Sequence, residues 1–306
     1  MPLPRAGYLG PTGTFSEEAL LASLGGEVEP VECATIEEVL ERAEEGSLDL
    51  GFVPIENALE GSVHATLDAL VHRHALLAVG EAIAPIQHHL IGLPDAELGS
   101  VRRVLSHPQA LAQTRRHRRA LLGDVEEVAT TSTAEAARLV VEGHDTGTAA
   151  VGPRRAAEHW GLSVLAEHLE DDPHNETRFW LVARDRLPPP TGSDRTAVAC
   201  FQVEDRPGSL LSLLTAFAAR GVNLTHLESR PTRESLGSYL FVIELEGHVT
   251  DSLVASALVD LREHGVRTKL LGSFPAARPS RRAASKTPSL QVVLDPSLPR
   301  PRSMAD

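Results

Sequence analysis

Short apolar runs alternate with helical periods along residues 1–184, and this alternation restricts the possible folds more than any other feature of the chain. Strand-like runs occur at residues 7–9, 49–53, 101–105, 127–129 and 148–151. Amphipathic or helical periods occur at residues 15–24, 35–43, 108–121, 132–142 and 154–160. This pattern is typical of an α/β domain, in which binding groups lie in the loops that follow the strands.

Two proline-rich stretches divide the chain. Residues 185–194 contain three consecutive prolines, which neither a helix nor a central strand accommodates, so we expect a linker there. Residues 275–306 are rich in Pro, Arg and Ser and carry six basic and two acidic residues, a composition that predicts a disordered tail. The sequence therefore predicts a large domain at 1–184, a small domain at 195–274 and a tail.

The predicted strands and helices of the small domain form a single compact set of six elements. Its strand-like runs lie at residues 196–203, 223–230, 238–246 and 267–271, and its helical periods lie at 208–220 and 251–264. The order βαββαβ over about 80 residues predicts a ferredoxin-like unit, although this architecture does not by itself name a ligand.

Composition excludes several classes of function. The chain has 306 residues, of which 42 are acidic and 29 are basic, and its net charge of −13 would repel a polyanion. Aromatic residues make up only 4%, so we expect no nucleic-acid partner, and we interpret the basic block at 115–119 as a solvated helix face. No apolar run approaches the roughly 20 residues of a membrane span, and we expect a soluble, cytoplasmic protein without a membrane partner.

Metal-binding patterns are missing from the sequence. Cys33 and Cys200 lie far apart and form neither a disulfide framework nor a cysteine-based zinc site. The histidines at 72, 74, 88 and 89 lack the i, i+4 spacing with a carboxylate that a metal-binding helix needs. We therefore expect no metal.

A glycine-containing segment at 7–16 follows the first strand and opens a helix. Glycines let backbone N–H groups approach an anion at the positive end of a helix, which would include Thr14. The spacing G-x-x-G-x-x-G is neither a dinucleotide fingerprint nor a P-loop. A tight turn with Ser/Thr capping explains the segment equally well.

The segment 53–57, Val-Pro-Ile-Glu-Asn, ends another strand. It would present the carboxylate of Glu56 and the amide of Asn57 at the carboxyl edge of the sheet. The alternative is a purely structural role, in which Asn57 belongs to a turn and Ser62 caps the next helix.

Ser-His-Pro-Gln at 106–109 occupies the equivalent place after the strand 101–105. Ser106 could cap the following helix and also donate to a ligand, while His107 is either catalytic or merely exposed. Gln109 lies in the first turn of the same helix.

A polar segment at 171–179 precedes the last strand of the large domain. Asn175, Thr177 and Arg178 bring together an amide, a hydroxyl and a guanidinium, and arginine suits planar recognition of a carboxylate. Thr177 has no neighbouring base in the sequence, so nucleophilic triad chemistry is not indicated. A polar loop with a surface arginine is the alternative.

Taken together and in this order, the motifs resemble those of the prephenate dehydratase family with an ACT regulatory domain behind the catalytic domain. The resemblance covers about residues 5–274 and rests on the segments 10–16, 53–57, 86–90, 106–113, 175–179, 207–210 and 223–231. Each segment is modest alone, but the ordered set is specific.

The resemblance implies two α/β lobes around a cleft, as in type II periplasmic binding proteins. Lobe 1 would contain about residues 1–80 and 166–184, and lobe 2 about residues 81–165. The family motif Thr-Arg-Phe falls on residues 177–179, which implies that Thr177 is catalytic. The expected substrate-binding residues are Arg178, Phe179, Asn175, Glu56, Asn57, Ser106, His107, Gln109 and Thr14.

The implied reaction is the decarboxylating dehydration of prephenate to phenylpyruvate, which demands no cofactor because aromatisation drives it. The ACT domain implies feedback control by L-phenylalanine at a subunit interface in a homo-oligomer, a dimer or a dimer of dimers. Its expected effector residues are Gly208, Ser209, Leu210, Asn223, Leu224, Glu228, Ser229, Arg230 and Pro231. Arogenate dehydratase activity and a non-catalytic small-molecule sensor are the alternative functions.

Overall fold

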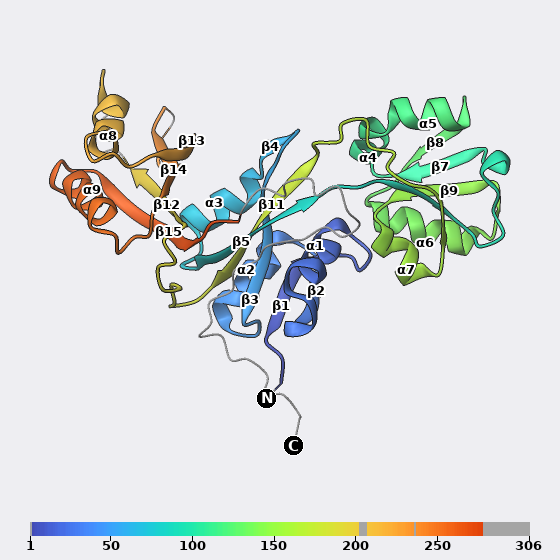
Figure 1. Cartoon of the computed structure of the whole chain (residues 1–306), viewed down its shortest axis with the longest axis horizontal. Helices are drawn as coiled ribbons and strands as arrows, with labels where there is room; N and C mark the ends of the chain where they lie inside the picture. Colours follow the sequence, from blue (N-terminus) through green and yellow to red (C-terminus); the bar gives the residue numbers. More distant parts are fainter. Residues whose placement is uncertain (1, 202–206, 236, 278–306) are drawn as a thin grey trace.

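The computed structural model describes residues 2–201, 207–235 and 237–277 (Figure 1). The predicted tail lies outside the described residues from residue 278 onward. Figure 1 shows three units in a row, with the small domain at one end, lobe 1 in the middle and lobe 2 at the other end.

Lobe 1 is built on strands from both ends of the large domain. The strand order is β5-β11-β3-β1-β2, in which β1 is parallel to β2 and β3 while β11 is antiparallel to β3 and β5. The strands are β1 (Arg5–Leu9), β2 (Glu29–Cys33), β3 (Leu50–Asn57), the short β4 (Gly61–Ser62), β5 (Leu77–Pro85) and β11 (Glu176–Ala183). The helices are α1 (Phe15–Leu24), α2 (Ile36–Glu45) and α3 (His64–His72).

Alternating side chains of the central strands bury both faces of this sheet. Phe52 and Phe179 point to the α1 face, where their rings stack with centroids 4.6 Å apart. Val53 and Trp180 point to the opposite face, which packs against α2 and α3. The helices on both faces confirm the predicted α/β class.

Lobe 2 contains a second sheet, of order β10-β6-β9-β7-β8. Its strands are β6 (His89–Gly92), β7 (Arg103–Ser106), β8 (Glu126–Ala129), β9 (Thr148–Gly152) and β10 (Ser163–Ala166). Its helices are α4 (Pro108–Gln113), α5 (Arg115–Leu122), α6 (Thr133–Gly143) and α7 (Arg154–Trp160). The chain enters lobe 2 between β5 and β6 and returns between β10 and β11, so two segments connect the lobes.

The continuous helix predicted at 108–121 is wrong, because the helix is broken at Thr114 into α4 and α5. Thr114 has φ −119° and ψ 7°, and its buried hydroxyl donates to the carbonyl of Ala110 at 2.7 Å. A threonine hydroxyl that bonds the backbone competes with regular helix geometry, which is why the periodicity did not reveal the break.

The small domain has the predicted ferredoxin-like order βαββαβ. Its antiparallel sheet has the order β13-β14-β12-β15. Its elements are β12 (Asp194–Phe201), α8 (Ser209–Ala218), β13 (Leu224–Pro231), β14 (Tyr239–Glu246), α9 (Ser252–Glu263) and β15 (Arg267–Pro275). One face of the sheet is covered by α8 and α9.

The other face of this sheet packs against lobe 1. Leu240 and Val242 of β14 share one apolar core with Leu67 of α3 and Trp180 of β11. At one edge of that contact Lys269 of β15 donates through Nζ to three carbonyls at the end of α3, at distances of 2.7 to 3.1 Å from Leu70, Val71 and His74. One face of the small-domain sheet therefore contributes side chains to the core of lobe 1.

The strands of the small domain and those of lobe 1 join edge to edge into one sheet where β15 runs parallel to β5. The contact pairs Gly272 with Ala78, and a Cβ at position 272 would lie 2.4 Å from the Ala78 carbonyl oxygen. Only glycine allows this approach. Of the described helices, none has the length and apolar character required to traverse a bilayer.

We predict that Gly272→Ala lowers the free energy of unfolding by about 1–3 kcal/mol, because the added methyl group overlaps the backbone of Ala78. Chemical denaturation of the two proteins measures the difference. The matched control is Gly143→Ala, at a helical position with no atom within 4 Å of the added Cβ. Equal stability of Gly272→Ala and the parent protein would contradict the close approach.

Candidate active site

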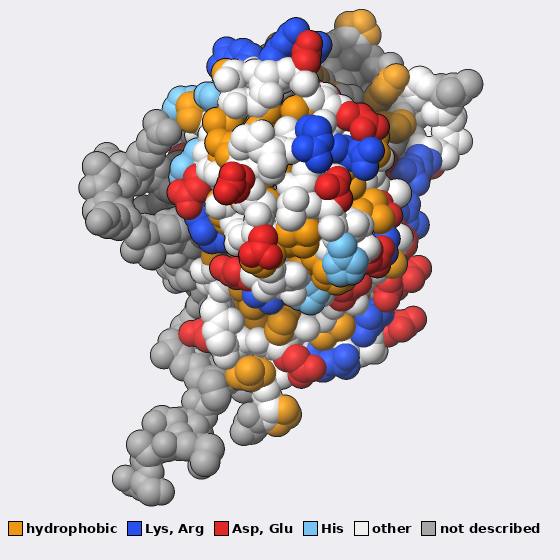
Figure 2. Space-filling view, turned by 90° about the vertical axis from the view of Figure 1, so that its right-hand side faces the viewer, with side chains coloured by type: hydrophobic (Ala, Val, Ile, Leu, Met, Phe, Trp, Pro, Cys, Tyr) orange, Lys and Arg blue, Asp and Glu red, His pale blue; other side chains and the backbone are white. Residues whose placement is uncertain are grey.

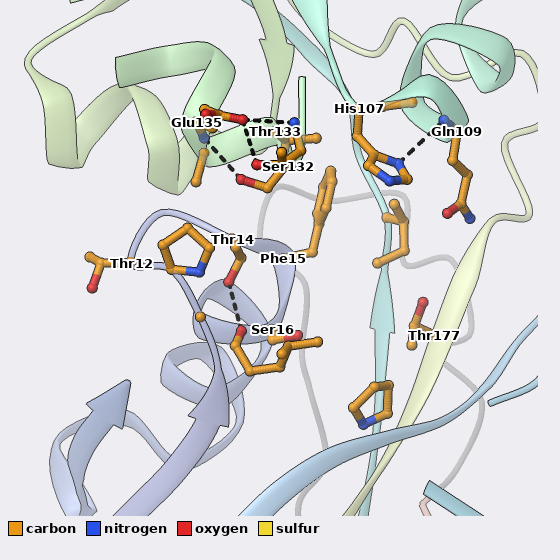
Figure 3. A pocket seen from close by; sticks show the side chains of 18 of the residues that line it. Thr12, Thr14, Phe15, Ser16, His107, Gln109, Ser132, Thr133, Glu135 and Thr177 are labelled. Atoms are coloured by element: carbon orange, nitrogen blue, oxygen red, sulfur yellow. Dashed lines mark hydrogen bonds between the residues drawn. The ribbon is translucent and has the colours of Figure 1, made fainter. Parts of the chain in front are cut away.

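A cavity of about 710 Å³ lies between the two lobes. Figure 3 shows side chains of α1, α4, α6 and β11 facing this shared space. Thr14 and Thr177 come from lobe 1, whereas His107, Gln109 and Ser132 come from lobe 2. Both lobes therefore contribute side chains to the candidate site.

Helix α1 directs its N-terminus toward the cavity. Thr14 is its N-cap residue, and its hydroxyl donates to the carbonyl of Leu9 at 3.2 Å instead of capping the helix. Gly13 has a φ of +88°, and a Cβ there would lie 3.3 Å from Cα of Ala156 in α7. Glycine is thus required both by the turn and by the approach of lobe 2.

Helix α6 directs its N-terminus to the same cavity from the opposite lobe. Ser132 caps this helix, since its hydroxyl accepts the N–H of Glu135 at 3.0 Å. The Glu135 carboxylate in turn accepts the N–H of Thr131 at 2.7 Å. Two helix N-termini, each carrying partial positive charge, thus converge on one space and favour an anionic ligand, while the Glu135 carboxylate also lines the α6 wall.

The lobes contact each other beside the cavity through α1 and α7. Arg155 Nη2 lies 3.0 Å from a Glu17 carboxylate oxygen, and its backbone N–H donates to Glu18 at 3.3 Å. Burial raises the pKa of Glu18 to about 7. These contacts hold the two walls of the cavity together.

Thr177 is paired with Asn57 across the β11–β3 ladder. Oδ1 of Asn57 accepts the backbone N–H groups of Leu59 and Glu60, each at 3.0 Å, so its Nδ2 must be the group that faces Thr177. Nδ2 donates to Thr177 Oγ1 at 2.9 Å. Because the Thr177 oxygen accepts this bond, its own hydrogen remains available to a ligand in the cavity.

A chain of side chains extends from Asn57 into lobe 2. Asn57 Nδ2 also donates to Asn175 Oδ1 at 2.9 Å, and Asn175 Nδ2 donates to Gln113 Oε1 at 3.1 Å. Gln113 Oε1 also accepts from His88 Nε2 at 3.1 Å, which places the hydrogen of the neutral ring on Nε2. Burial lowers the pKa of His88, so the ring is held neutral.

The structure brings many of the expected substrate-binding residues together. The expected residues that line the cavity are Thr14, Asn57, His107, Gln109, Thr177 and Phe179. Asn175 is buried one hydrogen bond away, behind Asn57. Glu56, Ser106 and Arg178 do not line it.

The placement of Arg178 corrects the expectation that it holds a substrate carboxylate. Neighbouring residues of a strand point to opposite faces, so Arg178 lies behind the sheet while Thr177 and Phe179 face the cavity. Its guanidinium binds the carboxylates of Glu56, Glu81 and Glu244. Burial alone would lower the pKa of Arg178, but Glu244 and Glu81 outweigh it and raise that pKa. Glu56 is likewise not a substrate-binding residue, because its carboxylate binds Arg178 and does not line the cavity.

Ser106 also differs from expectation. Its side chain is fully buried and donates to the carbonyl of Val151 in β9 at 2.6 Å. The N–H of Gln109 is instead accepted by Nδ1 of His107 at 3.3 Å. Ser106 therefore fastens β7 to β9, and His107 caps α4.

The sequence did not identify several residues of the cavity wall: Phe15, His88, Thr131, Ser132, Thr133, Arg138 and Trp160. One signal was available for part of this set, because Ser132 and Glu135 have the spacing of a capping box. Nothing in the sequence shows that α6 faces α1, since this depends on how the lobes meet.

The expected effector residues lie on two segments of the small domain. Gly208 is the N-cap of α8 with a φ of 90°, and it is followed by Ser209 and Leu210. Asn223 precedes β13, which carries Leu224, Glu228, Ser229, Arg230 and Pro231. Arg230 binds Asp68 of α3 through two nitrogens at 3.0 and 2.9 Å, and Glu228 lies 3.1 Å from His64 of α3. Part of this motif therefore contacts lobe 1.

The surface of lobe 2 carries charges of both signs. Figure 2 shows Lys and Arg side chains interspersed with Asp and Glu over this end of the molecule. The basic block is exposed as expected except at Arg118, which is buried and lies 3.1 Å from Glu127; Arg119 lies 3.5 Å from Asp124. Within the described ranges, no group of three or more His, Cys, Asp or Glu side chains is arranged to hold a metal ion.

Comparison with known protein families agrees with this geometry. A family model described as prephenate dehydratase matches residues 6–187, and one described as ACT domain matches residues 199–263. The chain belongs to the prephenate dehydratase family. Its small domain is an ACT domain.

Individual relatives cover most of the chain. The prephenate dehydratase of Amycolatopsis methanolica is 41% identical over 277 residues, which is 90% of each protein. A crystal structure of prephenate dehydratase from Arthrobacter aurescens in complex with L-Phe is 42% identical, with a TM-score of 0.81 over 89% of this chain and 90% of that one. A structure described as a novel type of quorum quenching acylase is 32% identical, with a TM-score of 0.80 over 91% and 100% of the two chains.

His89 does not line the cavity, and its burial yields a prediction about acid stability. Burial lowers its pKa from 6.5 to about 4, so the unfolded chain takes up a proton on acidification before the folded chain does. The free energy of unfolding therefore falls as the pH drops from 6.5 towards 4. We expect His89→Gln to reduce this fall, measured as urea midpoints at about pH 7.5 and about pH 4.5. The control is His174→Gln at an exposed ring, and identical acid sensitivity of both variants would contradict the prediction.

Proposed function

We propose that this protein is a prephenate dehydratase that works through hydrogen-bond donation by Thr177. The substrate would lose its ring carboxylate as CO2 and its ring hydroxyl as water, which forms the aromatic ring of phenylpyruvate. An enzyme that catalyses this reaction is a carbon–oxygen lyase. The observation that carries the proposal is the Thr177 hydroxyl, whose oxygen is occupied by Asn57 and whose hydrogen is available to the cavity.

The charge of the substrate matches the two walls of the cavity. Prephenate carries two carboxylates, and the N-termini of α1 and α6 approach from opposite lobes. We assign one carboxylate to each helix N-terminus, with Thr14 and Thr133 beside them. This assignment replaces the clamp expected of Arg178.

The reaction needs help with one difficult step, because hydroxide is a poor leaving group. A threonine hydroxyl is a very weak acid, so Thr177 would stabilise the departing oxygen by a hydrogen bond and not by complete proton transfer. The proton that completes the water molecule would come from solvent or from His107. Nδ1 of His107 accepts the Gln109 N–H, so only the imidazolium form of His107, which gives up this bond, can supply that proton.

Thr177→Val tests this role, because valine has nearly the same shape but no hydroxyl. We expect kcat to fall about 10²–10³-fold, the effect typical of losing one well-placed donor. Thr177→Ser keeps the hydroxyl and serves as the matched control, with clearly higher turnover. The ultraviolet absorbance of phenylpyruvate measures both, and turnover of Thr177→Val close to that of the parent would exclude Thr177 from the mechanism.

The same assay separates the remaining functions. Competition between prephenate and arogenate distinguishes the two dehydratase activities, which differ in a keto or an amino group on the side chain. Ligand binding without any product would favour the sensor. A separate demonstration of acylase activity would be required before the activity named for the acylase-like relative is considered for this chain.

We further propose that L-phenylalanine binds the ACT domain and lowers dehydratase activity. The relative from Arthrobacter aurescens was crystallised in complex with L-Phe. The candidate residues lie on β13, the last strand of its sheet, and at the start of α8. Among the described strands β13 pairs only with β14, and an edge of this kind suits pairing with a second copy of the chain, which supports a homo-oligomer. Cys33 and Cys200 are free thiols, which is consistent with a role in the cytoplasm.

We expect saturating phenylalanine to inhibit prephenate turnover and to shift the oligomer equilibrium, because an effector changes activity only by favouring one of two states. Activity is measured with and without phenylalanine, and mass by light scattering under both conditions. Tryptophan and alanine serve as control amino acids. Unchanged activity at saturating phenylalanine would contradict this regulation.

A further inference from the structure

A cluster of buried charges lies directly behind Thr177. Arg178 donates to Glu81 of β5 at 2.8 Å and, through two nitrogens, to the two carboxylate oxygens of Glu244 at 2.7 and 2.6 Å. The side chains of Arg178, Glu81 and Glu244 are 9%, 0% and 2% exposed. Glu244 belongs to β14 of the ACT domain, so this cluster joins the two domains.

Glu244 lies at the border between this charged cluster and an apolar core. It shares a face of β14 with Leu240 and Val242, which pack into the core common to the ACT domain and lobe 1. A buried carboxylate is strongly destabilising unless a cation accompanies it. Arg178 supplies that cation through two parallel hydrogen bonds, whereas Arg195 is 4.0 Å from Glu244. The ACT domain therefore helps to fix the position of Arg178, together with Glu56 and Glu81 of lobe 1.

Arg178 is also covalently joined to Thr177. Both residues belong to β11, and the register between β11 and β3 shifts between Arg178 and Phe179. A shift of this kind is a local irregularity that re-aims side chains. Movement of Arg178 would consequently change the direction of the Thr177 hydroxyl, which depends on the bond from Asn57.

We propose that Arg178 and Glu244 are positioning residues, through which the ACT domain holds Thr177 in its productive orientation and transmits the effect of its effector to the cavity. This inference rests on the proposed function. It assigns to Arg178 a role behind the active site in place of contact with the substrate.

The same interface contains a matched contact that does not reach β11. Lys269 of the ACT domain also places a cation on lobe 1, but its partners are carbonyls at the end of α3, and neither Lys269 nor α3 lines the cavity. Loss of this contact weakens the attachment of the domain without acting on Thr177. It therefore separates positioning from general docking.

The test compares Glu244→Gln, Arg178→Lys and Lys269→Met in the full chain. Glu244→Gln removes the charge and keeps the shape, and Arg178→Lys keeps the charge but loses the paired hydrogen bonds. We expect both to lower kcat about 100-fold with little change in KM, because a displaced donor affects the transition state more than substrate binding. We also expect both to lose most of the inhibition by phenylalanine while still binding it in equilibrium dialysis. Lys269→Met is expected to retain kcat and inhibition.

The outcomes distinguish this inference from the proposed function. Absence of prephenate turnover in the parent protein contradicts the proposed function itself. Turnover in the parent together with an unchanged kcat in Glu244→Gln overturns only the positioning role, as does an equal loss in Lys269→Met. If Glu244→Gln does not fold, Arg178→Lys alone decides, since its charge still compensates Glu81 and Glu244.

Discussion

The insertion of β11 between β3 and β5 is the interaction on which the rest of the structure depends. Asn57 and Thr177 are separated by 120 positions in the sequence, yet the β11–β3 ladder places them within a hydrogen bond of each other. All of lobe 2 lies between β5 and β11 in the sequence. The pairing of β11 with β3 therefore brings lobe 2 back to lobe 1 and closes the cleft between them. One strand thus creates both the donor and the cavity that it faces.

The two faces of β11 contact different parts of the protein. Thr177 and Phe179 face the cavity and the α1 core, while Arg178 and Trp180 face the core shared with the ACT domain. Strand geometry makes this division inevitable, since adjacent side chains point in opposite directions. A three-residue motif therefore links catalysis on one face to domain contact on the other, with only a peptide bond between them.

Periodicity and motif order predicted much of the architecture. The α/β pattern and the ferredoxin-like small domain required only local runs, and the family resemblance placed Thr177 and Asn57 in one expected site. Local patterns did not reveal β2, β5, β6 or β10, because β6 and β10 are short and the Ala and Gly residues of β5 and the Pro of β2 have low strand propensity. The sequence also placed Arg178 and Ser106 in the cavity, since residue type alone does not show which face of a strand meets the ligand.

By itself, the sequence determined the elements, their order and the chemical groups available at the ends of strands, because these follow from side-chain periodicity and from short-range turn chemistry. Only the tertiary structure decided which groups meet. The direction of the Thr177 hydrogen depends on an amide from another strand, the opposed helix N-termini depend on the contact between α1 and α7, and the partner of Arg178 belongs to another domain. Contacts between residues far apart in the chain are set by the packing of whole elements, which no local pattern encodes.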